Sequence, residues 1–256
     1  MSNLTTEVDN LISELCTDDG YVHNNIEGGQ GNHFHSIKIN QLVDIIDKLN
    51  DGKKEDSGLF TNHIKFATER FYILLTMFFN AMLRHGAAPE DLLLGTMFPL
   101  IKNRRGNAQN SDNYRAITIG TCLSKLFELL ILNKQSHVFH TSDLQFGFKE
   151  NSSPVICSFV AQEVINHYVD NGSNVFTVLL DASKAFDRVN FIKLFKKLIE
   201  KKMCPLVIRL LLNSYTSQKL NVRWNATLSE VFGVTNGVRQ SGILSPIFLV
   251  FIWMSC

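Results

Sequence analysis

The chain has 256 residues, of which 45% are hydrophobic and 19% charged, so it is too apolar for a disordered protein and long enough for one large core or two subdomains. Its net charge of +1 hides an uneven distribution: residues 1–91 have a balance of −7, residues 92–183 of 0 and residues 184–256 of +8. A basic final third is typical of a chain that binds a polyanion.

The five cysteines are odd in number and far apart in sequence, which excludes a disulfide framework and a zinc ribbon. The N-terminal residues lack an apolar signal core, and the longest apolar run, Ile247 to Met254, is too short to span a bilayer. We therefore expect an intracellular protein without a signal peptide or a membrane-spanning segment.

Residues 1–36 are polar, and we expect a short helix followed by a flexible linker. His33 and His35 could ligate a metal ion, but without a nearby cysteine or further histidine a pair of loop histidines is the favoured interpretation. Helices are expected over residues 39–49 and about 61–84. The second of these carries an apolar stripe at helical spacing, which predicts a core face: Phe71, Leu74, Leu75, Phe78 and Met82.

Two β-favouring segments, residues 95–102 and 114–119, flank a polar loop and predict an antiparallel hairpin. Four basic residues lie in or beside the loop: Lys102, Arg104, Arg105 and Arg115. Guanidinium and ammonium groups match phosphate oxygens, so the hairpin could clamp phosphates. The alternative is an ordinary solvated turn, which the residues alone favour.

Further helices are expected over residues 121–133, from Ser153-Pro154, over 191–199 and from Pro205. The helix after Ser153 carries an apolar stripe that we expect to be buried: Ile156, Phe159, Val160, Val164 and Tyr168. Between the first two helices, Gly147 suits a turn or a close backbone approach. Paired strands are expected over 219–224 and 230–234, followed by a fully apolar helix from Ser245.

The run from Val175 to Leu180 is apolar and β-favouring, which predicts a buried central strand. It ends on Asp181, and a second carboxylate, Asp187, follows six residues later. A carboxylate on a rigid element is a suitable ligand for a hard ion such as Mg²⁺. From this segment alone, the favoured interpretation is that Asp181 does no more than end the strand.

Three stretches in this order resemble the reverse transcriptases of non-LTR (LINE-like) retrotransposons: FPLIKNRRGNAQNSDNYRAITIGTCLSKLFE, DASKAFDRV and NGVRQSGILSP. The resemblance covers about residue 56 to the C-terminus. It implies an α+β right-hand polymerase fold, helix-rich with a small antiparallel sheet. Residues 1–55 would be an N-terminal helical and linker extension, 56–150 a fingers-like region and 151–256 a partial palm.

The resemblance also implies roles for individual residues. Asp181 matches the first catalytic, metal-binding aspartate, and the carbonyl of Ala182 can help to coordinate metal. The positions matching the nucleotide site are Lys102 and Arg115 for the triphosphate, Phe186 as a steric gate beneath the sugar, and Gln240 and Gly242. Arg104, Arg105 and Gly147 would contact nucleic acid. Core packing is an alternative for Phe186, and we expect Asp187 and the pair Lys125 and Glu128 to be structural.

Two features depart from the family pattern. Ser241 stands where many relatives have glycine directly after the glutamine, and no Asp-Asp pair follows Asp181. We therefore expect a fragment that ends before the Ala-Asp-Asp palm motif and is inactive alone.

The complete enzyme would be an RNA-directed DNA polymerase, a nucleotidyltransferase with two Mg²⁺ ions that takes an RNA template, a DNA primer and deoxynucleotide triphosphates. A non-catalytic nucleic-acid-binding remnant is the main alternative, and an unrelated Mg²⁺-dependent phosphotransfer domain a weaker one. The residues do not decide whether this chain is itself an enzyme or what its oligomeric state is.

Overall fold

A computed structural model of the chain describes residues 36–52, 55, 58–139, 142–149 and 151–253, together with the single residues 6, 10 and 13. The expected N-terminal helix and the pair His33 and His35 lie outside the described residues. Within the described part, no helix has the length and apolar character needed to cross a membrane.

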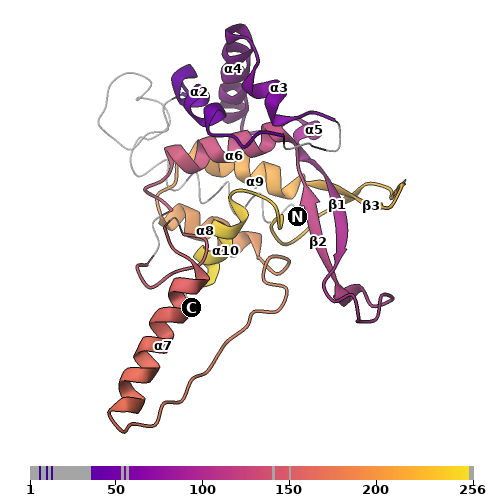
Figure 1. Cartoon of the computed structure of the whole chain (residues 1–256). Helices are drawn as coiled ribbons and strands as arrows, with labels where there is room; N and C mark the ends of the chain where they lie inside the picture. Colours follow the sequence, from indigo (N-terminus) through magenta and orange to yellow (C-terminus); the bar gives the residue numbers. More distant parts are fainter. Residues whose placement is uncertain are drawn as a thin grey trace.

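The described elements are mostly helices, with a small sheet beside them (Figure 1). The helices are α2 (Ile39–Asp47), α3 (Thr61–Lys65), α4 (Glu69–His85), α5 (Glu90–Leu93), α6 (Cys122–Lys134), α7 (Pro154–Asp170), α8 (Phe191–Glu200), α9 (Pro205–Thr216) and α10 (Ser245–Trp253). The strands are β1 (Leu94–Ile101), β2 (Tyr114–Ile119), β3 (Lys219–Trp224), β4 (Thr227–Leu228) and β5 (Phe232–Gly233).

Local signals in the sequence set several helix ends. The side chain of Thr121 accepts a hydrogen bond from the Ser124 amide at the start of α6, and Asn190 does the same for Lys193 at the start of α8. Gly86 ends α4 with a φ of 66°, a left-handed conformation that favours glycine. These caps satisfy backbone groups that a helix cannot pair internally.

One hydrophobic core joins α2, α4, α6, α8, α9 and α10. Leu194, Phe195 and Leu198 lie on one face of α8 and are fully buried, while the lysines of this helix lie on its other faces. The core therefore includes both the region before residue 150 and the region after it.

The expected single helix over residues 61–84 is divided into α3 and α4. Leu75 and Met82 of its predicted stripe are buried, but Leu74 is 64% exposed, and Phe79 takes a fully buried position instead. The stripe prediction was partly wrong because helical spacing gives the period of a buried face and not the neighbours that cover it.

The sheet is mixed and not antiparallel as expected. β1 and β2 form the predicted antiparallel hairpin and β5 pairs with β3 antiparallel, but β1 and β3 are parallel, with Leu94 opposite Lys219. Both strands leave the helical body at the same place, where Lys219 Nζ lies 3.0 Å from Glu90 Oε2. Because β1 follows α5 and β3 follows α9 from this common point, the two strands run in the same direction.

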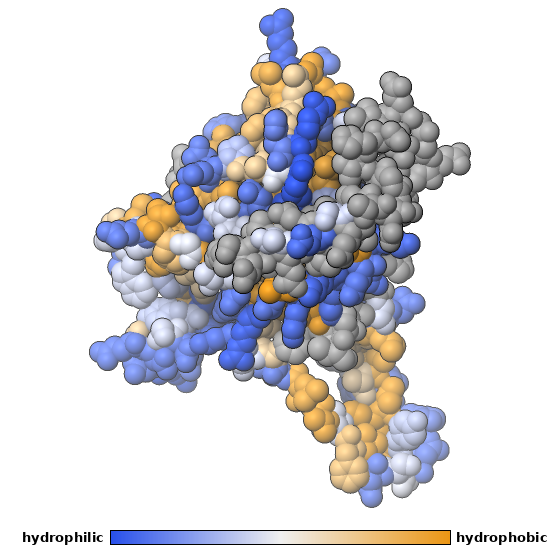
Figure 2. All heavy atoms as spheres, turned by 180° about the vertical axis from the view of Figure 1, so that it is seen from behind, coloured by the Kyte–Doolittle hydropathy of each residue, from blue (hydrophilic) through white to orange (hydrophobic). Residues whose placement is uncertain are grey.

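The predicted buried strand over residues 175–180 is absent, because the segment is extended but unpaired. Phe176 is 91% exposed and Leu180 94%. The stripe of α7 was also wrongly predicted as buried, because this helix has no buried residue. Figure 1 shows α7 and the following segment extending away from the body, and Figure 2 shows apolar side chains on that extension.

The physical reason is the lack of a partner strand. A strand is stabilised by pairing its backbone N–H and C=O groups with a neighbour, and no strand of the described residues lies beside 175–180. High β-propensity without such a neighbour does not produce a sheet.

Phe195 is fully buried and Phe176 is 91% exposed, so removing the two rings should have unequal effects on stability. Phe195→Ala leaves a cavity in the core and should lower the free energy of unfolding by about 3–5 kcal/mol. Phe176→Ala removes the same atoms from an exposed position and should change it by less than about 0.5 kcal/mol. Urea denaturation measures both values, and equal losses would show that Phe176 is buried in solution.

Candidate nucleotide site

Two loops that are far apart in sequence meet through their backbones. The amide of Val238 donates to the Phe186 carbonyl at 2.9 Å, and the amide of Gly237 donates to the Val189 carbonyl at 3.0 Å. Gly237 has a φ of 87°, and a Cβ there would lie 2.9 Å from the Asp187 Cα. Glycine is therefore required at 237 both by backbone conformation and by close approach.

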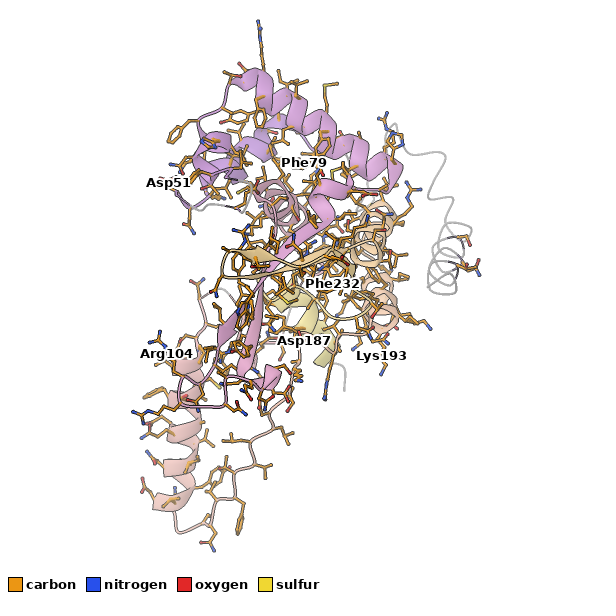
Figure 3. The ribbon with its side chains drawn as sticks, turned by 90° about the vertical axis from the view of Figure 1, so that its right-hand side faces the viewer. Asp51, Phe79, Arg104, Asp187, Lys193 and Phe232 are labelled. Atoms are coloured by element: carbon orange, nitrogen blue, oxygen red, sulfur yellow. The ribbon has the colours of Figure 1, made fainter. Side chains whose placement is uncertain are left out.

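A cleft of about 290 Å³ opens beside this junction. One wall comes from the hairpin, through Met97, Ala116 and Thr118, and the other from residues 232–240. Asp187 also lines the cleft, and its Oδ1 lies 3.5 Å from Gln240 Nε2. Figure 3 shows Asp187 near the middle of the molecule, where these segments meet.

Gln240 is therefore at the cleft, as is Asp187, which the sequence marked as structural. Asp181, Ala182 and the hairpin cations Lys102 and Arg115 are not among the lining residues. Asp181 is exposed at the end of the unpaired segment, and Ala182 is partly buried. Within the part of the chain that the structure describes, no three His, Cys, Asp or Glu side chains form a group that could hold a metal ion.

The hairpin loop is joined to the loop between the two aspartates. Lys184 Nζ lies 2.6 Å from Asp112 Oδ1, and Lys102 Nζ donates to the Asp112 carbonyl at 2.8 Å. The hydrogen bond and charge of Lys184 hold the pKa of the Asp112 carboxyl below its usual value. Sequence reasoning missed Lys184, because nothing in its spacing indicates a partner 72 residues earlier.

The remaining hairpin cations, Arg104, Arg105 and Arg115, are exposed. Figure 3 shows Arg104 toward the outer end of the hairpin. Their charges face solvent, where they are accessible to a phosphate backbone.

Phe186 packs against the core and contacts a second aromatic ring. The rings of Phe186 and Phe148 meet edge to face, with centroids 6.4 Å apart. This contact brings the turn at Gly147 to the same side as the loop of Asp187. A Cβ at Gly147 would meet no atom within 4 Å, so local packing does not require this glycine.

Gly242 lies in a tight turn of the loop that carries Gln240. Its amide donates to the Arg239 carbonyl at 3.1 Å, which closes a turn directly after Gln240. A Cβ on Gly242 would collide with the Ser245 hydroxyl oxygen. A side chain at 242 would therefore require the Ser245 hydroxyl to take another rotamer, whether or not a substrate approaches the turn.

Comparison with known proteins adds a second line of information. Residues 101–254 match the family described as "Reverse transcriptase (RNA-dependent DNA polymerase)". The chain is 27% identical over 220 residues to the "Probable RNA-directed DNA polymerase from transposon BS" of Drosophila melanogaster. This match covers 82% of the chain and 24% of the relative.

Two other relatives match a similar share of the chain. The "Probable RNA-directed DNA polymerase from transposon X-element" of the same fly is 28% identical over 214 residues, covering 81% of the chain and 23% of the relative. The "RNA-directed DNA polymerase from mobile element jockey" of Drosophila funebris is 23% identical over 216 residues, and the match covers 82% of the chain and 23% of the relative. The chain thus spans about a quarter of the length of the curated relatives it matches.

The ion pair between Lys184 and Asp112 predicts a measurable effect on the hairpin loop. Lys184→Ala should increase hydrogen exchange at the amides of residues 103–113, because it releases the loop from its neighbour. Lys193→Ala removes the same charge from an exposed position on α8 and serves as the control. Equal exchange in the two variants would contradict the prediction.

The same contact should depend on pH and salt in a defined direction. The pKa of Asp112 is lowered, so the contact is present at neutral pH and is lost as the pH falls through that lowered value. Salt should weaken it as well, because both side chains are largely exposed. Protection factors at residues 103–113, which correct exchange for its intrinsic pH dependence, should fall toward acid pH, and values that stay constant from pH 7 to pH 2 would contradict this expectation.

Proposed function

Because the chain belongs to the reverse transcriptase (RNA-dependent DNA polymerase) family, we propose that it is the part of a LINE-like RNA-directed DNA polymerase that binds the incoming nucleotide beside the template. One observation carries the proposal: parts of the three family-like stretches, namely the loops at 186–189 and 237–240 and the strands of the basic hairpin, meet around one cleft. A phosphotransfer domain unrelated to polymerases would have no reason to combine these stretches.

Within this proposal, residues 56–150 act as fingers and residues 151–256 as a partial palm, with residues 1–55 as an extension. The division concerns function and not folding, because β3 of the second part pairs with β1 of the first and one core includes both. The two parts should therefore fold together.

We assign nucleotide binding to the cleft and its surroundings. Gln240 lines the cleft and would contact the nucleotide. Phe186 does not line the cleft but directly precedes Asp187, which does, and it would lie beneath the sugar. Lys102 and Arg115, on the hairpin that forms one wall of the cleft, would receive the triphosphate. Arg104, Arg105 and the turn at Gly147 would contact nucleic acid, because phosphate contacts draw on exposed basic groups.

The family uses divalent metal ions, and in the proposal Asp181 and the Ala182 carbonyl would supply ligands for Mg²⁺. A single carboxylate does not make a two-ion site, and the described residues contain no group of three acidic or other ligating side chains. The residues described therefore do not fit the complete site, and we infer that this chain does not extend primers alone.

The unpaired apolar segment 175–180 and the exposed stripe of α7 support the same inference. Both faces have the composition of a core and neither is covered. Since the chain spans only about a quarter of the length of these relatives, we propose that other parts of such a polymerase pack against these faces and pair with the segment that ends at Asp181.

A non-catalytic nucleic-acid-binding role is the second candidate. It is favoured by the balance of +8 after residue 183, which does not depend on the metal site. The two functions differ in whether a nucleotide binds at the cleft.

Binding to RNA or to an RNA–DNA duplex should depend strongly on salt and little on sequence, because it neutralises phosphates. The double variant Arg104→Gln, Arg105→Gln should flatten the slope of log affinity against log salt, by about 0.7–0.9 for each lost phosphate contact. The control is Lys48→Gln, Arg70→Gln, which changes the charge equally in the acidic first third. A slope that these two double variants alter equally would contradict the assignment.

Primer extension tests the catalytic inference. The chain alone should extend no primer on an RNA template with Mg²⁺ or Mn²⁺, whereas the chain lengthened by a relative's following palm and thumb segments should do so. Asp181→Asn should abolish extension by the lengthened chain. Template-dependent synthesis by the short chain that disappears in Asp181→Ala would show that the inference is wrong.

A further inference from the structure

The carboxylate of Glu128 on α6 holds the far end of the loop that carries Gln240. Its Oε2 accepts hydrogen bonds from the amides of Ile243 at 2.6 Å and Leu244 at 3.1 Å. These amides directly precede α10, where a helix leaves backbone donors without internal partners. A carboxylate is a strong acceptor for such donors.

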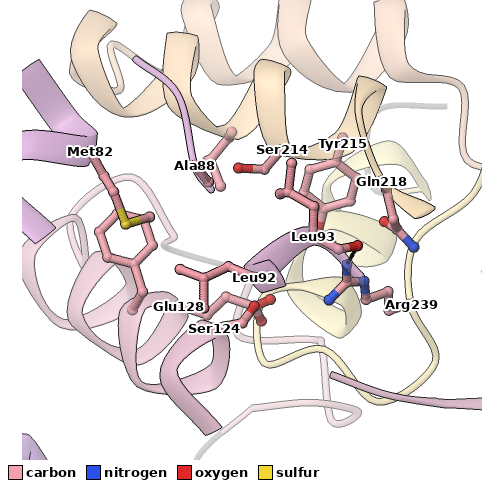
Figure 4. A pocket seen from close by; sticks show the side chains of 12 residues that line it. Met82, Ala88, Leu92, Leu93, Ser124, Glu128, Ser214, Tyr215, Gln218 and Arg239 are labelled. Atoms are coloured by element: carbon pink, nitrogen blue, oxygen red, sulfur yellow. Dashed lines mark hydrogen bonds between the residues drawn. The ribbon is translucent and has the colours of Figure 1, made fainter. Parts of the chain in front are cut away.

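Arg239 fixes the near end of the same loop to a different element. Its Nη2 donates to the Leu93 carbonyl at 2.8 Å, at the junction of α5 and β1, as Figure 4 shows. The guanidinium lies against Gly120, where a Cβ would be 2.9 Å from Arg239 Nη1. The lack of a side chain at 120 makes room for this contact.

Both side chains border one small cavity of about 50 Å³ between α6 and α9 (Figure 4). Burial raises the pKa of the Glu128 carboxyl, against the opposing effects of the Leu244 amide, Arg239 and the Ile243 amide. Burial lowers the pKa of Arg239, and the charge of Glu128 opposes that shift. The two groups therefore compensate each other electrostatically in a poorly solvated site.

Gln240 lies between these two attachments. The loop is held at 239 by its own arginine and at 243 and 244 by Glu128, while 237 and 238 are joined to the loop at 186–189. Neither Glu128 nor Arg239 needs to touch a substrate to determine where Gln240 points. Sequence reasoning marked Glu128 as structural without naming what it holds.

We propose that Glu128 and Arg239 are positioning residues that hold the Gln240 loop in its nucleotide-binding position, Glu128 by binding the loop backbone to α6 and Arg239 by binding its own side chain to the last residue of α5. The inference rests on the proposed function, because it takes Gln240 to contact the nucleotide. It adds that nucleotide affinity depends on hydrogen bonds between these two core-facing side chains and backbone atoms, in addition to the contacts of Gln240 itself.

The experiment measures the dissociation constant of a deoxynucleotide triphosphate for the chain bound to an RNA template and DNA primer. Glu128→Ala leaves two partly buried donors without their acceptor and should weaken nucleotide binding about 10-fold or more. Glu128→Gln keeps an acceptor oxygen of the same shape and should stay within about 3-fold of the unchanged chain. Hydrogen exchange at Ile243 and Leu244 should rise strongly in the first variant and little in the second.

A matched control separates positioning from general stability. Leu198→Ala opens a cavity in the core without removing a hydrogen bond to the loop, and it should destabilise the fold without weakening nucleotide binding at temperatures below unfolding. If Leu198→Ala weakens binding as much as Glu128→Ala, or if the alanine and glutamine variants at 128 bind alike, the positioning role is overturned.

Two further outcomes distinguish this inference from the proposed function. If exchange at Ile243 and Leu244 is unchanged in Glu128→Ala, the attachment itself is absent and the inference fails while nucleotide binding stands. If the unchanged chain binds no nucleotide at the cleft, the proposed function fails and the positioning role fails with it.

Discussion

The candidate site depends on two backbone hydrogen bonds, from Gly237 to Val189 and from Val238 to Phe186. They join segments about fifty residues apart at a distance that only glycine at 237 permits. Because the bonds are between backbone atoms, they place Asp187 and Gln240 at one cleft whatever those side chains contact. The neighbouring attachments through Glu128 and Arg239 extend this arrangement into the helical core.

The position of the hairpin follows from the parallel pairing of β1 and β3. That pairing places the hairpin along one side of the cleft, and the Lys184–Asp112 contact joins its loop to the aspartate-bearing loop. An exposed ion pair contributes little to stability and is weakened by salt. The hairpin is thus anchored firmly at its base, through the sheet, and weakly at its tip, which is where a phosphate-binding element would need freedom to move.

The segment before Asp181, unlike the hairpin, is not anchored by pairing with any described strand. It has the composition of a core strand and the exposure of a surface loop, since Leu179 and Leu180 are more than nine-tenths exposed. An apolar segment with unpaired backbone groups is prone to pair with another chain. A catalytic aspartate at its end would gain a rigid position only through pairing with sequence other than the described strands.

Features that depend on a few neighbouring residues could be determined from the sequence. They include the hairpin and the helix that begins after Ser153, because capping and turn chemistry are local. The roles expected for Gln240, Asp181, Lys102 and Arg115 came from resemblance and remain predictions.

Only the tertiary structure decided which apolar faces are covered and which strands pair. Val175 to Leu180 satisfied the local requirements of a strand and is not one, because sheet formation needs a neighbour that propensity cannot supply. Likewise the partners of Glu128, Arg239 and Lys184 lie between 72 and 146 residues away in sequence. Contacts over such distances depend on how the helices pack, which residue spacing does not encode.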